Sequence, residues 1–293
     1  MTSRFDNDPQ QCSHTSPREM LPRISVVTPS YNQAAYLEAT IRSVLDQNYP
    51  NLEYIIIDGG STDGSVEIIR RYESRLAYWV SEPDGGQSHA LNKGFARASG
   101  DWFAWLNSDD LYLPGTFSIV AREIGANPDL DWLVGPIIVA DHALNQVGRF
   151  EPVCNARNWL DFVCTKERFG TALPQPGTFW SRRAWQQTGS FDENLHYAMD
   201  HDYWGRMAFQ GFRPHCLTMD LAVIRRHAEA KTTTGASRFV TEELRIVNKW
   251  RKIVSGSDGL RLAFYCSTLP VRLWCKRRYR TLRALLLSRG RLW

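Results

Sequence analysis

Two adjacent acids, Asp109 and Asp110, follow an apolar run in the stretch FAWLNSDDLYLP, residues 103–114. The run is typical of a strand, and the acids that end it form either a turn with a capping carboxylate or a set of metal ligands. Carboxylates repel a diphosphate and can lie beside one only when a divalent cation stands between them. In a nucleotide-binding pocket, the pair would supply oxygen ligands for that cation.

Two further acids, Asp200 and Asp202, lie near the start of a helix that we expect over 199–210. Either could be the general base that an acceptor hydroxyl needs, although the helix dipole also favours acids there. Side chains two residues apart do not share a helix face, so we expect at most one in the site. In RRHAEAKT, His227 could complete the metal shell and Lys231 could hold phosphate, although a lone histidine is also a common structural residue.

These residues need elements that bring them together. We expect four strands, at 24–28, 52–58, 76–80 and 101–106. Between them, apolar residues recur at the spacing of a helix. Such alternation predicts a parallel sheet, whose strands end at one edge where ligands bind. Each expected strand ends on a polar cluster, at 29–32, 58–63, 82–87 and 107–110. Four clusters directed at one edge indicate a site.

The second half of the chain is less regular. We expect strands over 131–140, 145–150 (returning antiparallel), 213–218 and 222–226. Residues 151–175 are expected to form a long loop or short helices, and 151–180 to govern acceptor choice. From 239 onward the pattern is helical and increasingly basic.

Several competing motifs are absent from the sequence. No GxGxxG follows the first strand and no GxxxxGK[ST] occurs, which argues against a dinucleotide-binding domain and a P-loop. DGGSTDGS lacks the alternating donors and the final Glu of a calcium loop. A nucleotidyltransferase would need a basic, Gly-rich triphosphate loop, and PSYNQAAYLE provides none.

Composition indicates a folded body with a basic tail. The 293 residues are 43% hydrophobic, which suffices for one substantial core. Nine Lys and Arg and no acid follow Asp258, so an anionic surface is the expected partner of the tail. An interfacial helix on anionic lipid and an ordinary packed helix both fit this tail. Because the body is acidic, nucleic acid is not an expected partner.

Targeting signals and cysteine pairs are also lacking. Residues 1–20 contain no apolar h-region, and no run of about 18 apolar residues occurs, so neither a signal peptide nor a spanning helix is expected. The six cysteines form no CxxC pair, so we expect reduced thiols and a cytoplasmic protein, with the inner face of the membrane as a further location.

Seven motifs resemble, in order, those of one family. They are VVTPSYNQ, YIIIDGGSTDGS, SEPDGGQSHALNKGF, WLNSDDLYLP, QPGTFWSRRAW, YAMDHDYWGRM and RRHAEAKT. From about residue 24 to 235 the chain resembles the inverting family 2 glycosyltransferases with the GT-A fold. The resemblance implies an α/β nucleotide-diphospho-sugar transferase fold with a mostly parallel central sheet flanked by helices. It also implies a divalent cation, Mn²⁺ or Mg²⁺.

The resemblance also implies a role for each matching residue. The catalytic base would be Asp200, and Trp204 and Arg206 would support its helix. Metal ligands would be Asp109, in a DXD-type motif, and His227. The residues expected at the donor are Pro29, Tyr31, Asn32, Asp58, Asp84, Gln87, Asn92, Lys93, Asn107 and Lys231. Among these, Asp58 and Asp84 would contact base or ribose, and Asn92 and Lys93 would lie near the diphosphate.

The sequence departs from the family pattern at three places. Many relatives have two acids where this chain has Asp58-Gly59, which leaves the donor nucleotide open. The first acid of the DXD-type motif is Asn107, whose amide can coordinate or orient but contributes no charge. Leu91 stands where many relatives have Arg, and Lys93 or Lys231 could compensate.

We therefore expect a metal-dependent inverting glycosyltransferase with a glycan or lipid-linked acceptor, acting in cell-surface polysaccharide synthesis. A non-catalytic nucleotide-sugar or glycan-binding protein on the same fold is the alternative. The expected organisation is a tail (1–22), a GT-A domain (23–238) and a helical basic extension (239–293). Within the domain, 23–115 would bind the nucleotide, and 116–238 would carry the acceptor and catalytic half.

Overall fold

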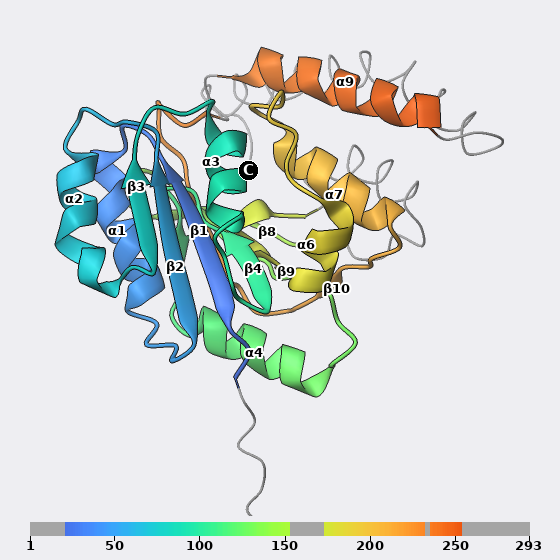
Figure 1. The fold of residues 1–293 in the computed structure, drawn as a ribbon, viewed down its shortest axis with the longest axis horizontal. Coiled ribbons are helices and arrows are strands. Elements are labelled where there is room, and N and C mark those ends of the chain that lie inside the picture. Colours follow the sequence, from blue (N-terminus) through green and yellow to red (C-terminus); the bar gives the residue numbers. More distant parts are fainter. Residues whose placement is uncertain (1–20, 153–172, 232–234, 254–293) are drawn as a thin grey trace, which may run out of the picture.

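The structure is a computed structural model that describes residues 21–152, 173–231 and 235–253. Its main sheet has seven strands in the order β10-β6-β9-β4-β1-β2-β3 (Figure 1). These strands are β1 (Ile24–Ser30), β2 (Leu52–Asp58), β3 (Tyr78–Ser81), β4 (Trp102–Trp105), β6 (Trp132–Val134), β9 (Thr178–Ser181) and β10 (His215–Cys216). Strands β1 to β4 pair in parallel, which confirms the predicted parallel sheet. Strand β9 runs antiparallel between β4 and β6, and no pattern in the sequence predicted it.

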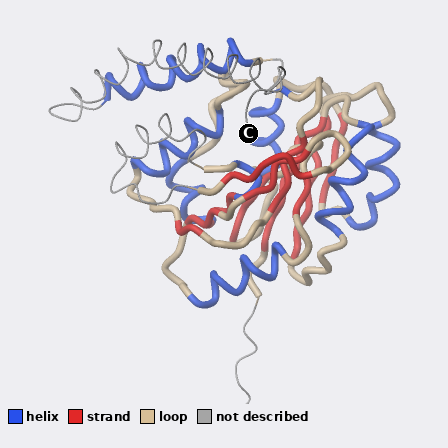
Figure 2. The backbone as a smooth tube through the Cα atoms, turned by 180° about the vertical axis from the view of Figure 1, so that it is seen from behind, coloured by secondary structure: helices blue, strands red, loops and turns tan. Residues whose placement is uncertain are grey.

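Helices cover both faces of this sheet (Figures 1 and 2). One face packs against α1 (Ala34–Leu45), α2 (Ser65–Tyr72) and α4 (Thr116–Ala126). The other packs against α3 (Gln87–Phe95), α6 (Arg182–Thr188) and α7 (Met199–Phe209), and α9 (Ala236–Ile253) packs on α7. Since successive strand residues point to opposite faces, Val26 joins the first core and Val27 the second. Two short 3-10 turns, Glu73–Arg75 and Gln175–Gly177, complete the described helical elements.

An aromatic cluster fixes α7 to the second face. The rings of Trp105 and Trp204 stack with centroids 5.8 Å apart, and Trp132 lies 5.6 Å from Trp204. Trp180 and Tyr203 pack against the same group. All five side chains are buried, so the position of α7, which carries the predicted base, is set by the core.

A second sheet brings the C-terminal strands to the end of the first. Its order is β5 (Leu111–Tyr112), β11 (Ala222–Arg225), β7 (Ile137–Ala140) and β8 (Gln146–Phe150). Strand β8 returns antiparallel to β7, as predicted. Strand β5 directly follows the acidic cluster at 107–110, and it pairs with β11. The acids and the RRHAEAKT segment therefore lie side by side.

The expected single strand over 131–140 is wrong. The chain breaks at Gly135-Pro136 into β6 and β7, which belong to different sheets. A Cβ at position 135 would lie 2.4 Å from Leu221 Cγ and 3.1 Å from the carbonyl oxygen of Met219. Pro136 has no N–H for a continuing ladder, so this dipeptide marks the crossing between the sheets.

Reduced thiols were also expected, and this is wrong for Cys216. The β10 residue is disulfide-bonded, and the other five cysteines all lie outside the described residues. Most of the expected tail, the segment 153–172 of the expected loop, and residues 254–293 of the basic extension also lie outside them. Among the helices of the described ranges, none is both long enough and apolar enough to cross a bilayer.

Candidate active site at the carboxyl edge of the sheet

The four polar clusters meet at one edge of the main sheet. Strands β4, β1, β2 and β3 are consecutive neighbours, and they pair with one another in parallel. Their carboxyl ends therefore carry 107–110, 29–32, 58–63 and 82–87 side by side, as the sequence predicted. This edge is the candidate site.

Hydrogen bonds join the loops after β1 and β2. Asn32, in the left-handed region with φ of 51°, accepts a bond from the backbone N–H of Thr62 at 2.9 Å. Asp63 accepts one from Ala34, the first residue of α1, at 2.9 Å. Burial opposes ionisation of Asp63, but bonds from Ser65 and Ala34 hold its pKa below the usual range. These loops form one surface, on which the predicted donor residue Tyr31 is 62% exposed.

Asp58 is buried and orders its own loop. Its carboxylate accepts bonds from the Ser81 hydroxyl at 2.7 Å and from the backbone and hydroxyl of Ser61. In this conformation the carboxylate is not presented to a ligand, and its predicted contact with base or ribose stays untested. A Cβ on Gly59 would lie 3.0 Å from an Asp84 oxygen. A side chain at position 59 would thus require the Asp84 carboxylate to shift by a few tenths of an ångström.

Asn92 and Lys93 do not contact the acidic corner, which is the cluster at 107–110 that follows β4. The Asn92 amide exchanges two hydrogen bonds with the backbone of Phe191, at 2.8 and 3.0 Å, and donates to Glu193. Lys93 pairs with Glu82. Both side chains tie α3 to neighbouring segments, so their predicted place beside a diphosphate has no support in this geometry.

Asp109 and His227 lie together, as predicted for two metal ligands. Their Oδ2 and Nε2 atoms are 3.0 Å apart, and the His227 ring lies 4.4 Å from that of Tyr36. Asp110 is buried and accepts a bond from the backbone N–H of Arg225 at 3.1 Å. Burial, and then the charge of Asp109, raise the pKa of Asp110 well above its usual range. Asp109 is therefore the accessible acid, and Asp110 is a structural one.

Asn107 forms four hydrogen bonds, and the two that its nitrogen donates could not be made by a carboxylate. Its oxygen accepts from Gln87 Nε2 at 2.7 Å and from Trp105 Nε1 at 3.3 Å. Its nitrogen donates to Asp110 Oδ2 at 3.2 Å and to Gln175 Oε1 at 3.1 Å. Only an amide can accept and donate in this way. Asn107 thus connects the residues of the corner, and Gln175 belongs to the corner although no motif in the sequence predicted it.

We expect Asn107→Asp, which restores the family acid, to destabilise the protein by about 2–3 kcal/mol, because a carboxylate would face Asp110 and Gln175 without a proton to donate. Urea unfolding of wild type, Asn107→Asp and Asn107→Ala measures this effect. The alanine variant loses the bonds without adding charge, and it should be the more stable of the two. Wild-type stability of Asn107→Asp, combined with tighter Mn²⁺ binding, would contradict the assigned role.

Lys231 connects this corner to the start of α7. Its Nζ donates to Gln87 Oε1 at 2.9 Å and lies 5.3 Å from the centre of the Tyr197 ring. Desolvation lowers the pKa of Lys231, and the negative charges of Glu242 and Asp200 oppose that effect. The predicted base is therefore within electrostatic reach of a side chain bonded to the predicted donor residue Gln87.

The two acids of α7 have different environments. The Asp202 side chain is fully buried, and it accepts bonds from Arg206 at 2.7 Å and from Lys249 at 3.3 Å. The Asp200 side chain is 18% exposed. Only Asp200 can reach a substrate, and Arg206 supports the helix as expected.

Helix α9 holds the segment before Asp200, which the sequence analysis missed. Glu242 accepts hydrogen bonds from three consecutive backbone N–H groups at 196–198, with distances of 2.9, 2.7 and 2.9 Å. Its neighbour Glu243 pairs with His201 Nδ1, and the other ring nitrogen lies 3.8 Å from Asp200 Oδ2. An acid pair in a helix gives no sequence signal for such a role, because its partners lie more than 40 residues away in the chain and those of Glu242 are backbone groups.

Comparison with known proteins identifies the family and the fold. The model of the glycosyl transferase family 2 matches residues 25–183, more than half of the chain. The chain belongs to this family. A Bacillus subtilis relative, the putative teichuronic acid biosynthesis glycosyltransferase TuaG, is 46% identical over 92 residues, which are 30% of this chain and 36% of that protein. The aligned part is thus about a third of each protein.

Solved structures of two glycosyltransferases share the fold. Staphylococcus aureus TarS 1–349 in complex with UDP-GlcNAc has a TM-score of 0.63 and 19% identity, over 85% of this chain and 72% of that one. The mannosyltransferase PcManGT from Pyrobaculum calidifontis, in complex with GDP-Man and Mn²⁺, has a TM-score of 0.61 and 19% identity, over 91% and 81%. At this identity the likeness shows the fold, which is the GT-A type expected from the sequence.

The donor atoms at the corner fit a divalent cation that arrives with a diphosphate. The described residues contain no group of three or more His, Cys, Asp and Glu side chains that could hold a metal alone. Asp109 and His227 would supply two ligands. Cations of the Mg²⁺ type are commonly held by one or two carboxylates together with substrate phosphates. An imidazole ligand favours Mn²⁺ over the harder Mg²⁺.

Proposed function

We propose that the protein is a metal-dependent, inverting glycosyltransferase that moves a sugar from a nucleotide-diphospho-sugar to an acceptor hydroxyl. One observation carries the proposal. Lys231 joins the acidic corner, through Gln87, to the surroundings of Asp200. A donor at the corner and an acceptor at Asp200 would therefore meet in one site. The relationship to TuaG supports a glycan or lipid-linked acceptor in cell-surface polysaccharide synthesis.

The residues of this chain have separate parts in the reaction. Asp200 takes the proton of the acceptor hydroxyl, whose oxygen attacks the anomeric carbon. The bond from that carbon to the diphosphate oxygen breaks, and its electron pair leaves with the nucleoside diphosphate. A single displacement inverts the anomeric configuration. The cation held by Asp109 and His227 would stabilise the charge on the leaving group.

A thermal-shift screen of UDP- and GDP-sugars, with and without Mn²⁺, tests donor binding. We expect one class to raise the melting temperature in a Mn²⁺-dependent way, because a ligand that binds only the native state stabilises it. The Asp109→Asn variant should lose the Mn²⁺-dependent part, since its amide contributes no charge. Donor binding without hydrolysis or transfer would favour the non-catalytic alternative, and an absence of binding would reject the proposal.

We also propose a cytoplasmic location, with the basic residues after 253 as a contact to the inner face of the membrane. Those residues lie outside the described ones. The disulfide at Cys216 argues against this location, because disulfides are rare in a reducing cytosol, and the location therefore needs a direct test. Fractionation of cells into soluble, membrane and extracytoplasmic material decides the location, and recovery in the last of these would reject the proposal.

A further inference from the structure

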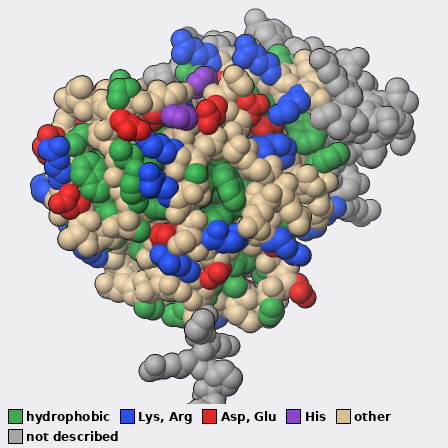
Figure 3. All heavy atoms as spheres, viewed as in Figure 1, with side chains coloured by type: hydrophobic (Ala, Val, Ile, Leu, Met, Phe, Trp, Pro, Cys, Tyr) green, Lys and Arg blue, Asp and Glu red, His purple; other side chains and the backbone are tan. Residues whose placement is uncertain are grey.

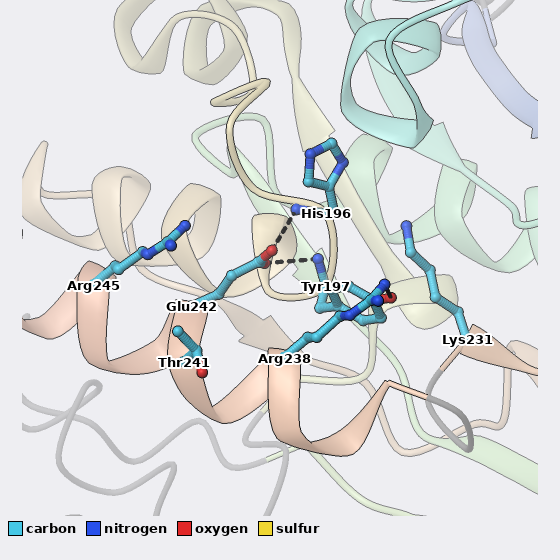
Figure 4. Close-up of a pocket in the computed structure, with 7 residues that line it drawn as sticks. All are labelled: His196, Tyr197, Lys231, Arg238, Thr241, Glu242 and Arg245. Atoms are coloured by element: carbon cyan, nitrogen blue, oxygen red, sulfur yellow. Dashed lines mark hydrogen bonds between the residues drawn. The ribbon is translucent and has the colours of Figure 1, made fainter.

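A pocket of about 470 Å³ lies between α9, the segment before α7, and Lys231 (Figure 4). This volume is within the range of roughly 300–1,000 Å³ that small-molecule sites occupy. Its lining includes His196, Tyr197, Lys231, Arg238, Glu242 and Arg245. Neither the family pattern nor the proposed mechanism uses Arg238 or Arg245.

The charge of the pocket is positive. Three cations, on Lys231, Arg238 and Arg245, face a single acid, Glu242. Both Glu242 oxygens already accept backbone N–H groups, as Figure 4 shows for two of the bonds. Figure 3 shows Lys and Arg side chains on this side of the molecule. The carboxylate that could repel an anion is thus engaged with the protein.

The two arginines keep donors available. Arg238 Nη1 donates to the Tyr197 hydroxyl at 3.1 Å, and this is its one hydrogen bond to a described residue. Arg245 has no hydrogen-bond or ion-pair partner within the described ranges. A guanidinium has five N–H groups in a planar fork that suits the two oxygens of a carboxylate or phosphate. The pocket therefore has the chemistry of an oxyanion site.

The pocket adjoins the proposed reaction centre. Lys231 belongs to its wall and also bonds Gln87, which bonds Asn107 of the acidic corner. The segment 196–198 leads into Asp200 at the start of α7. A molecule in the pocket lies on the side of Asp200, where the acceptor hydroxyl must be.

We propose that this pocket binds an anionic group of the acceptor, a sugar carboxylate or a sugar phosphate, and so selects acidic acceptors. The inference rests on the proposed function. Arg238 and Arg245 would hold the anion, and Lys231 would stand between it and the donor. The diphosphate of the donor belongs instead to the corner around Asp109.

The test measures binding of three probes to the full chain at low salt. Trigalacturonate carries carboxylates, glucose 6-phosphate carries a phosphate, and maltotriose is a neutral trisaccharide. We expect at least one anionic probe to bind more tightly than maltotriose. Arg245→Gln and Arg238→Gln should each weaken that probe by about tenfold, the effect of losing one charged hydrogen bond, and should leave maltotriose unchanged. The probe that responds distinguishes carboxylate from phosphate.

The matched control is Arg70→Gln, which removes an exposed arginine from α2 on the opposite face of the sheet. It should leave every affinity unchanged. Equal affinities for all three probes, or unchanged affinities in both pocket variants, would overturn the inference. Equal weakening of nucleotide-sugar binding by Arg245→Gln would overturn it too, because the pocket would then belong to the donor. Failure of the wild type to bind any nucleotide sugar counts against the proposed function alone, since the probe series decides the pocket separately.

Discussion

Asp200→Asn is expected to lower sugar transfer by about 10²–10⁴-fold, the usual contribution of a general base. The amide has nearly the same shape as the carboxylate, and its oxygen can still accept the hydrogen bond from the backbone N–H of His201, now 2.9 Å long. It cannot take a proton from the acceptor. The affinity for the nucleotide sugar, measured by thermal shift, should therefore remain near that of the wild type.

Asp202→Asn is the matched comparison in the same helical turn. Asp202 is buried between Arg206 and Lys249, so this change should lower the melting temperature and leave the chemistry of the folded fraction unchanged. Single-turnover rates, corrected for folded protein, separate the two effects. Near wild-type turnover in Asp200→Asn would show that another group is the base.

Glu242→Ala is expected to lower the free energy of unfolding by about 3 kcal/mol, because three backbone N–H groups lose their acceptor at about 1–3 kcal/mol each, and water replaces part of the loss. The initial rate should fall by more than the unfolded fraction explains, since the freed segment at 196–198 precedes Asp200. Urea unfolding and initial rates on the same samples measure both quantities.

Glu242→Gln provides the graded control for that variant. Its carbonyl oxygen can accept hydrogen bonds, but its NH₂ group cannot, so both losses should be intermediate. Unfolding of Glu242→Ala at the wild-type urea concentration would mean that α9 does not stabilise the segment before α7.

The nucleotide half could be predicted because its signals are local. Apolar runs alternate with helical spacing from Ile24 to Leu106, and parallel pairing places their ends together without further information. Strand β9 could not be predicted in this way. Its four residues enter the sheet between β4 and β6 after a long excursion of the chain, so long-range packing alone places them.

The residues of the site also differ in whether local motifs or distant partners determine their roles. The resemblance paired Asp109 with His227, and the structure brings these side chains to 3.0 Å. The amide at Asn107 stood out in the sequence as a departure, yet its reason lies in Gln175, a partner 68 residues away. The expected domain boundary at 238/239 falls within α9. It could not be placed better from the sequence, because no pattern there shows that Glu242 binds the segment before Asp200.

The role of α9 also sets an order on synthesis. Ala198 and its acceptor Glu242 are 44 residues apart, and at about 5–20 residues per second a ribosome needs roughly 2–9 s to add that length. Domains fold from the N-terminus as they emerge, so the nucleotide half can pack while the segment before Asp200 still awaits its partner. Since His227 and Lys231 also precede Glu242 in the chain, every residue proposed to hold the donor would be synthesised before the residue that fixes the segment leading into Asp200.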